Sequence, residues 1–146
     1  MVPGLSEPTP ILSFEGYSSD DHQALFGFRM MPPDTDGDVG PNHYVQWNNL
    51  GFKVWDKAGN LNPLTAPNGL PGNIFWAGFG GVCESDNNGD PVVLYDHLAD
   101  RWFMTQFTDS SNPDGHACVV VSQTPDPLGA YWLYDFVVSP GAFNDY

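Results

Sequence analysis

Short strand-like segments separated by turn residues recur along the C-terminal half of the chain, and they constrain the fold more than any other feature. Residues 91–96, 101–107, 117–124 and 131–138 are rich in β-branched or aromatic side chains and bounded by Gly, Pro, Asp or Asn. No window of about a dozen residues has helical apolar spacing without a Gly or Pro in it, and the best short helical candidate is residues 21–28. The sequence therefore predicts an all-β fold.

The connections between these segments predict hairpins. Residues 97–100 join the first two segments, and the polar stretches 109–115 and 125–129 have the residue types of turns. Residues 90–138 are therefore expected to form a four-stranded antiparallel meander, which has the size of one β-propeller blade.

A weaker copy of this unit is expected over residues 30–89. Gly37-Asp38 precedes its strand-like segments 43–47 and 52–55, much as Gly89-Asp90 precedes the later unit. The repeat is suggestive because the same two residues stand before the first strands of both units.

The rest of the chain fits around these two units. Residues 11–14 resemble a short apolar strand, and 61–84 form an insertion with an apolar centre. Residues 1–10 are expected to be a linker, or a start left after removal of a leader. Residues 11–146 are then one all-β domain of antiparallel, four-stranded, blade-like meanders, a partial β-propeller, with a β-sandwich as the alternative.

The chain is strongly acidic, with 18 acidic and four basic side chains and a net charge of -14. Such a surface repels phosphate backbones and anionic membranes, so nucleic acid is not expected as a partner. No run of 18 or more apolar residues exists, so membrane insertion is not expected either. The charge suits divalent cations and the exterior of a cell.

The two cysteines, Cys83 and Cys118, favour a disulfide, because the acidic, lysine-poor and aromatic-rich composition is typical of secreted proteins. Two buried free thiols are the alternative. The sequence has no CxxC or paired CxxH pattern for zinc. We therefore expect a secreted, extracellular protein.

Three longer phrases carry a resemblance to a known family. They are "PPDTDGDVGPNHYVQWNNLGFKVWDKAGN", "GDPVVLYDHLADRWFMTQF" and "CVVVSQTPDPLGAYWLYDF". They resemble the opening blades of secreted bacterial β-propeller proteins of the sialidase-like, repeat-bearing kind, over roughly residues 30–146. The sialidase-type Asp-box is absent, so sialidase chemistry is not implied. Propellers close with about four to eight blades, so the resemblance implies either further C-terminal blades or self-association of copies.

Alternating acids suggest a cation site. Asp34, Asp36 and Asp38 are spaced so that their oxygens could converge on one Ca²⁺, although Gly37 does not match the EF-hand template. The alternative is a polar turn that leads into the first blade. The same two interpretations apply to a second set, Asp86, Asn88 and Asp90.

Two further groups of side chains are candidates for binding or catalysis. Paired carboxylates are what glycosidases require, and Asp90, Asp96 and Asp100 flank one strand and its turn. Their alternative role is turn and cap chemistry. Aromatic side chains could stack on sugars, or pack in the core and between blades. They are Trp47, Trp55, Trp76, Tyr131 and Trp132, with Trp102 and Tyr134 as further members.

Together these features predict an extracellular propeller-type module for binding or assembly. Its expected partners are polysaccharide or a copy of itself, with Ca²⁺ as a stabiliser. The alternative function is a secreted polysaccharide hydrolase or lyase that uses carboxylates.

Overall fold

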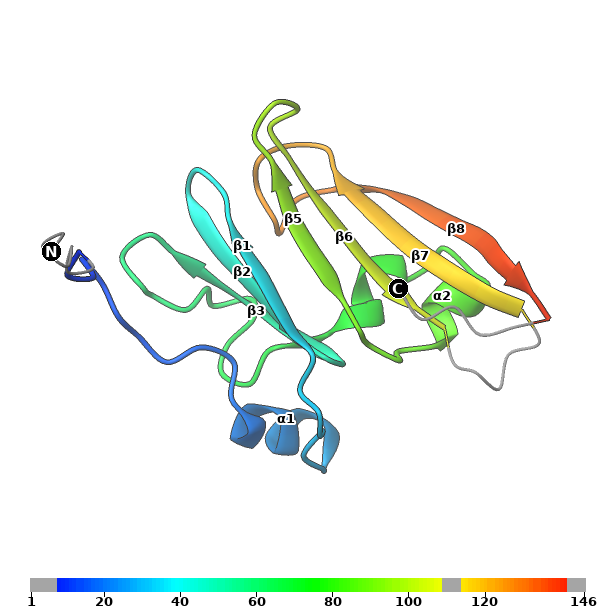
Figure 1. The fold of residues 1–146 in the computed structure, drawn as a ribbon, viewed down its shortest axis with the longest axis horizontal. Coiled ribbons are helices and arrows are strands. Elements are labelled where there is room, and N and C mark those ends of the chain that lie inside the picture. Colours follow the sequence, from blue (N-terminus) through cyan, green and yellow to red (C-terminus); the bar gives the residue numbers. More distant parts are fainter. Residues whose placement is uncertain (1–7, 109–113, 142–146) are drawn as a thin grey trace, which may run out of the picture.

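The computed structural model describes residues 8–108 and 114–141 and confirms an all-β fold (Figure 1). Two four-stranded antiparallel sheets, each in chain order, lie side by side. The N-terminal sheet consists of β1 (Thr35–Val39), β2 (His43–Asn48), β3 (Gly51–Asp56) and β4 (Leu70–Pro71). The C-terminal sheet consists of β5 (Val92–Asp96), β6 (Arg101–Phe107), β7 (Asp114–Ser122) and β8 (Tyr131–Pro140).

The C-terminal sheet confirms the four predicted strands of the meander. The turn at 97–100 forms because the Asp96 carboxylate accepts the backbone N–H groups of Leu98 and Ala99 at 2.8 and 3.0 Å. Of the predicted turn at 109–115, residues 109–113 lie outside the described part of the chain.

Two predictions for the N-terminal half were wrong. Residues 11–14 form no strand, because this segment is held by ring packing and makes no ladder; the Phe14 ring lies 5.7 Å from that of Trp55. Thr35–Val39 is strand β1 and not a polar turn. It pairs with β2 from Thr35 opposite Asn48 to Val39 opposite Tyr44.

The short helix α1 (Ser19–Phe26) begins two residues before the predicted 21–28. Ser18 caps it, because its hydroxyl accepts the N–H of Asp21 at 3.1 Å while the Asp21 carboxylate accepts the N–H of Ser18 at 2.9 Å. The helix ends at Gly27, whose φ of 85° a glycine adopts without steric cost.

The two sheets pack through one face each, and we call these their inner faces. Side chains alternate along each strand, so the inner face takes every second residue. The core between the inner faces is closed by the 3₁₀-helix η1 (Gly72–Trp76) and the short helix α2 (Val82–Ser85). Its buried members are Val45, Trp47, Phe52, Val54, Trp76, Cys83, Val93, Tyr95, Trp102, Met104, Cys118 and Val120.

Candidate functional site

Asp36 and Asp38 join the edge strands of the two sheets. β1 and β5 are both edge strands, so some of their N–H groups have no partner in a ladder. One oxygen of Asp36 accepts the N–H of Val93 at 2.8 Å, and one oxygen of Asp38 accepts that of Tyr95 at 2.7 Å. The other oxygen of each carboxylate accepts the N–H of the next residue in β1, at 2.8 and 2.7 Å. Two carboxylates thus satisfy four edge N–H groups.

This arrangement explains the alternation of acids around a glycine. Residues two apart in a strand point to the same face, so Asp36 and Asp38 both reach β5. At Gly37 a Cβ would lie 2.7 Å from the backbone oxygen of Val45, so no side chain fits there.

The loops that precede β1 and β5 meet at Asn49. The Asn49 amide donates to the Asp34 carboxylate at 2.9 Å and to the Pro32 carbonyl at 3.4 Å. Gly89 packs against the same side chain, because a Cβ there would lie 2.2 Å from Asn49 Oδ1. Asp34 and Asp90 both adopt left-handed backbone, with φ of 41° and 42°. The two loops therefore share one conformational feature at corresponding places.

The second acidic set lies in the loop after α2, where Asp86, Asn88 and Asp90 are all half-buried. Among the residues that the structure describes, no group of three or more His, Cys, Asp or Glu side chains is placed to hold a metal ion. Calcium binding by either acidic set stays a prediction. Thermal melts with and without EDTA test it, and an unchanged midpoint would count against it.

Two of the acids proposed for catalysis, Asp96 and Asp100, have local partners. The N–H groups of Ala99 and Leu98 hold the pKa of Asp96 below its usual value, because they stabilise the ionised form. A general acid at neutral pH requires the opposite shift. Asp100 accepts the hydroxyl of Tyr95. Both contacts tie the carboxylates to the turn at the end of β5.

The aromatic candidates divide between the core and the surface. Tyr131 is half-buried against η1. Trp132 is 47% exposed. The remaining tryptophans are at most 3% exposed and belong to the interior of the protein: Trp47, Trp55, Trp76 and Trp102.

The outer face of the C-terminal sheet is an exposed apolar surface. It carries Trp132, Tyr134 and Phe136 along β8, and the rings of Tyr134 and Phe136 stack with centroids 5.8 Å apart. The register of the strands places the following side chains on this face: Val92, Leu94, Phe103, Thr105, Phe107, Ala117, Val119, Val121, Trp132, Tyr134 and Phe136. Thr105 is the uncharged polar member of this set. The same alternation also places the charged residues Asp96 and Arg101 on this face, opposite each other at the end next to the turn at 97–100.

Residues Leu94 and Phe136 were missed as candidates from the sequence. The available signal was Val119–Val121, which is apolar at every position and so indicates a strand that is covered on both faces. In the structure one of those faces is the core, and the other remains uncovered by the described residues.

The outer face of the N-terminal sheet, in contrast, is covered by residues 11–28. The N–H of Tyr17 donates to Gln46 Oε1 at 2.7 Å. The ammonium of Lys53 lies 2.7 Å from the Asp21 carboxylate, and both side chains are largely buried. This segment therefore closes one outer side of the two-sheet stack.

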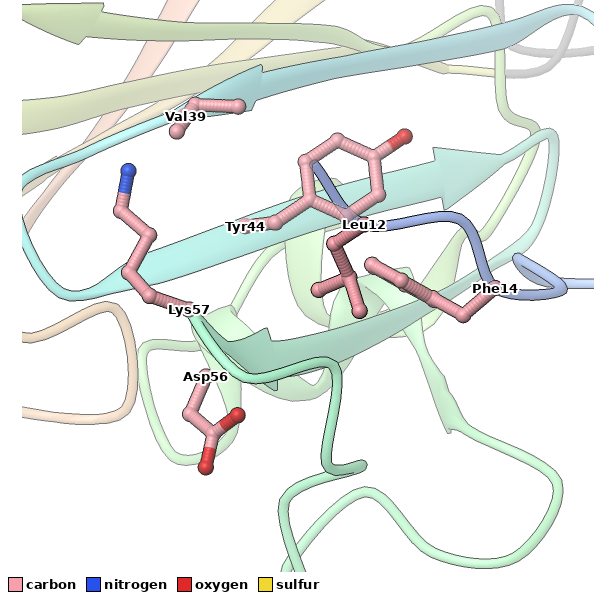
Figure 2. Close-up of a pocket in the computed structure, with 6 residues that line it drawn as sticks. All are labelled: Leu12, Phe14, Val39, Tyr44, Asp56 and Lys57. Carbon is pink, nitrogen blue, oxygen red and sulfur yellow. The ribbon is translucent and has the colours of Figure 1, made fainter. Parts of the chain in front are cut away.

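The cover leaves a hollow of about 280 Å³ between the segment and the sheet (Figure 2). Leu12 and Phe14 approach from the segment, and the Lys57 ammonium extends toward Val39. The lining residues are Leu12, Phe14, Val39, Tyr44, Asp56 and Lys57. The hollow marks the end of the outer face that the segment does not fill.

Cys83 of α2 and Cys118 of β7 form a disulfide, as predicted. Disulfides persist in oxidising compartments, so the bond points to such a compartment. Within the described ranges, no helix has the length and apolar character that crossing a membrane requires.

Comparisons with known proteins identified no relative of this chain. A scan against family models, a search of curated proteins and a search of solved structures each found no match to this chain.

Proposed function

We propose that this chain is an extracellular, β-propeller-type assembly module that docks a further β-sheet on the outer face of its C-terminal sheet. One observation carries the proposal. The outer face of the C-terminal sheet corresponds, position by position, to the inner face of the N-terminal sheet, and that inner face already has a sheet packed on it.

The correspondence follows from the two left-handed aspartates. Asp34 and Asp90 each precede the first strand of a sheet with nearly the same φ. Asp36 and Val92 each lie two residues after these aspartates, so they occupy equivalent positions in the two sheets. Asp36 reaches from the inner face of its sheet, whereas Val92 lies on the outer face of the other.

The cross-strand neighbours keep the same relation. In the N-terminal sheet the row is Asp36, Trp47 and Phe52, and in the C-terminal sheet it is Val92, Thr105 and Val119. Each sheet thus turns an equivalent face toward its successor. This repetition supports propeller blades, which stack around an axis with their first strands adjacent, and β1 does lie beside β5.

The extracellular part of the proposal rests on the disulfide and the charge. A cross-link of this kind is rare in reducing compartments. A net charge of -14 keeps a protein with an exposed apolar face in solution.

Polysaccharide binding is the second candidate, and the exposed rings of Trp132, Tyr134 and Phe136 favour it. Sugar sites also need polar groups that fix the hydroxyls. Within the described strands, the polar groups of this face are Thr105, Asp96 and Arg101. They lie on β5 and β6 and not beside the exposed rings of β8, which is why we rank a sheet above a sugar as the occupant. Retention of the chain by an insoluble polysaccharide, lost in Trp132→Ala, would reverse this order.

The assembly function is tested on the full chain with an apolar fluorescent dye and static light scattering. We expect the wild type to bind the dye or to associate as its concentration rises. Leu94→Lys should reduce both signals, because Leu94 lies on the outer face. Leu98→Lys is the matched control, since Leu98 is 99% exposed in the turn and lies off that face. A wild type that neither binds dye nor associates would refute the proposal.

A further inference from the structure

We infer that the partner on the outer face of the C-terminal sheet is a second copy of this chain, which docks by the same face to form a closed two-fold dimer. The inference rests on the proposed function and names its partner. Three features of the described residues lead to it: which faces are free, how large the free face is, and how charge is distributed.

The first feature is the availability of faces. Two copies could in principle continue the stack head to tail, with the outer C-terminal face of one on the outer N-terminal face of the next. Residues 11–28 cover that second face through Tyr17 and the buried Asp21–Lys53 pair. The inner faces are occupied by each other. Of the four sheet faces only the exposed apolar face is then free, so a contact between sheet faces of two copies joins that face to itself.

The second feature is area. Leu94, Trp132, Tyr134 and Phe136 are 51%, 47%, 41% and 50% exposed. Because a large aromatic side chain offers roughly 150–250 Å², these four together expose on the order of 400 Å² per copy. If this surface is buried on both copies, together with that of the half-buried neighbours, the interface buries about 1,000 Å² in total, which is the lower limit for a specific interface. The expected dimer is therefore sensitive to dilution.

The third feature is charge. Each copy carries a net charge of -14, so two copies repel one another at a distance. Within the described strands, the charged side chains of the docking face are Asp96 and Arg101, which oppose each other at the end next to the turn. Two such faces can therefore meet over their apolar part without desolvating an unpaired charge. Screening by salt should remove the repulsion while leaving the apolar contact intact. Association should therefore strengthen as salt is added, which is opposite to an interface built on ion pairs.

Sedimentation equilibrium of the full chain tests the dimer. We expect the mass to rise with concentration and to level at two chain masses. The Kd should be several-fold tighter in about 500 mM NaCl than in about 20 mM NaCl, because the higher salt concentration screens the repulsion much more strongly. Leu94→Lys should weaken Kd by about tenfold or more, and Leu98→Lys should leave it nearly unchanged. The salt series on the wild type does not depend on any variant folding.

Three outcomes separate this inference from the function on which it rests. Growth beyond two chain masses would overturn the two-fold dimer and leave the assembly function standing. A single chain mass at all concentrations, with dye still bound, would also overturn the dimer, since the face would then be free for a different sheet. A single chain mass without dye binding would overturn both.

Discussion

Substituting Asp36→Asn removes one of the oxygen acceptors that join the edges of β1 and β5. The amide keeps one oxygen and replaces the other by an NH₂ group. Either the N–H of Val93 or that of Gly37 then faces a donor, so one backbone group loses its partner. Asp38→Asn has the same consequence for the N–H of Tyr95 or of the residue that follows Asp38.

The magnitude follows from the kind of bond. Hydrogen bonds to a charged group contribute about 1.5–3 kcal/mol, and these sites are half-buried, so we expect a loss of about 1–2 kcal/mol for each single variant. For a domain of this length that corresponds to a fall in Tm of roughly 3–8 °C. The two sites are neighbours on one strand, so the double variant should not be additive.

The control is Glu15→Gln. Glu15 is exposed, and its side chain takes part in none of the hydrogen bonds or ion pairs found among the described residues. The Glu15→Gln substitution removes one negative charge, as Asp36→Asn does, so it controls for the relief of repulsion among the acidic side chains of the protein. Its free energy of unfolding should stay within about 0.5 kcal/mol of the wild-type value.

Amide hydrogen exchange locates the effect. Asp36→Asn should expose the N–H of Val93 to exchange, and Asp38→Asn that of Tyr95, each leaving the other site more protected. The melts are run in EDTA and again in calcium, because the loss should be the same in both if backbone N–H groups are the partners. If the Asp36→Asn and Asp38→Asn variants have the same Tm as Glu15→Gln, and their Val93 and Tyr95 amides exchange at wild-type rates, the reasoning is refuted.

Three further predictions concern other parts of the fold. Replacing both Cys83 and Cys118 by Ser opens a cross-link over a sequence separation of 35 residues, and chemical denaturation should show a loss of about 3–4 kcal/mol, whereas no loss would mean that strain offsets the cross-link. Asp21→Asn should cost about 3 kcal/mol at neutral pH, because the Lys53 side chain is only 6% exposed and would lose its partner. Burial raises the pKa of Asp21, but the bonds to Lys53 and to the helix cap outweigh it and lower the pKa below 3.8. The stability that this pair contributes is therefore present above about pH 4 and is lost as the pH falls through the lowered pKa of the folded state. The denaturation curves of variant and wild type should accordingly converge in acid. Gly72→Ala would place a Cβ 2.0 Å from an indole carbon of the core, and denaturation should show a loss of about 1–3 kcal/mol, while wild-type stability would mean that the indole moves without cost.

Much of the C-terminal sheet could be predicted from local sequence, because its strands are alternating runs of β-branched and aromatic residues between turn formers. Asp96 illustrates why the turns were also predictable, since its carboxylate bonds to N–H groups only two and three residues on. The pairing of Cys83 with Cys118 followed from composition and count, and the structure bears it out.

β1 could not be predicted in this way. Asp and Gly are poor strand formers, and by local preference Asp36-Gly37-Asp38 is a turn. The stretch is a strand because its carboxylates satisfy the N–H groups of Val93 and Tyr95, which lie more than fifty residues away in sequence, with a separation of 57 for each bond. Residues 11–14 show the reverse case, since an apolar segment that looked like a strand is held by rings instead.

The sequence alone determined the all-β class and the four-stranded unit and favoured the disulfide, because alternation, turn chemistry and cysteine count are local or compositional properties. Only the tertiary structure decided which face of each sheet is buried. Each strand of the C-terminal sheet is apolar on both faces, so the pattern does not distinguish the core face from the exposed one. That choice depends on which sheet the carboxylates of Asp36 and Asp38 reach, and on the N-terminal segment that covers the opposite side.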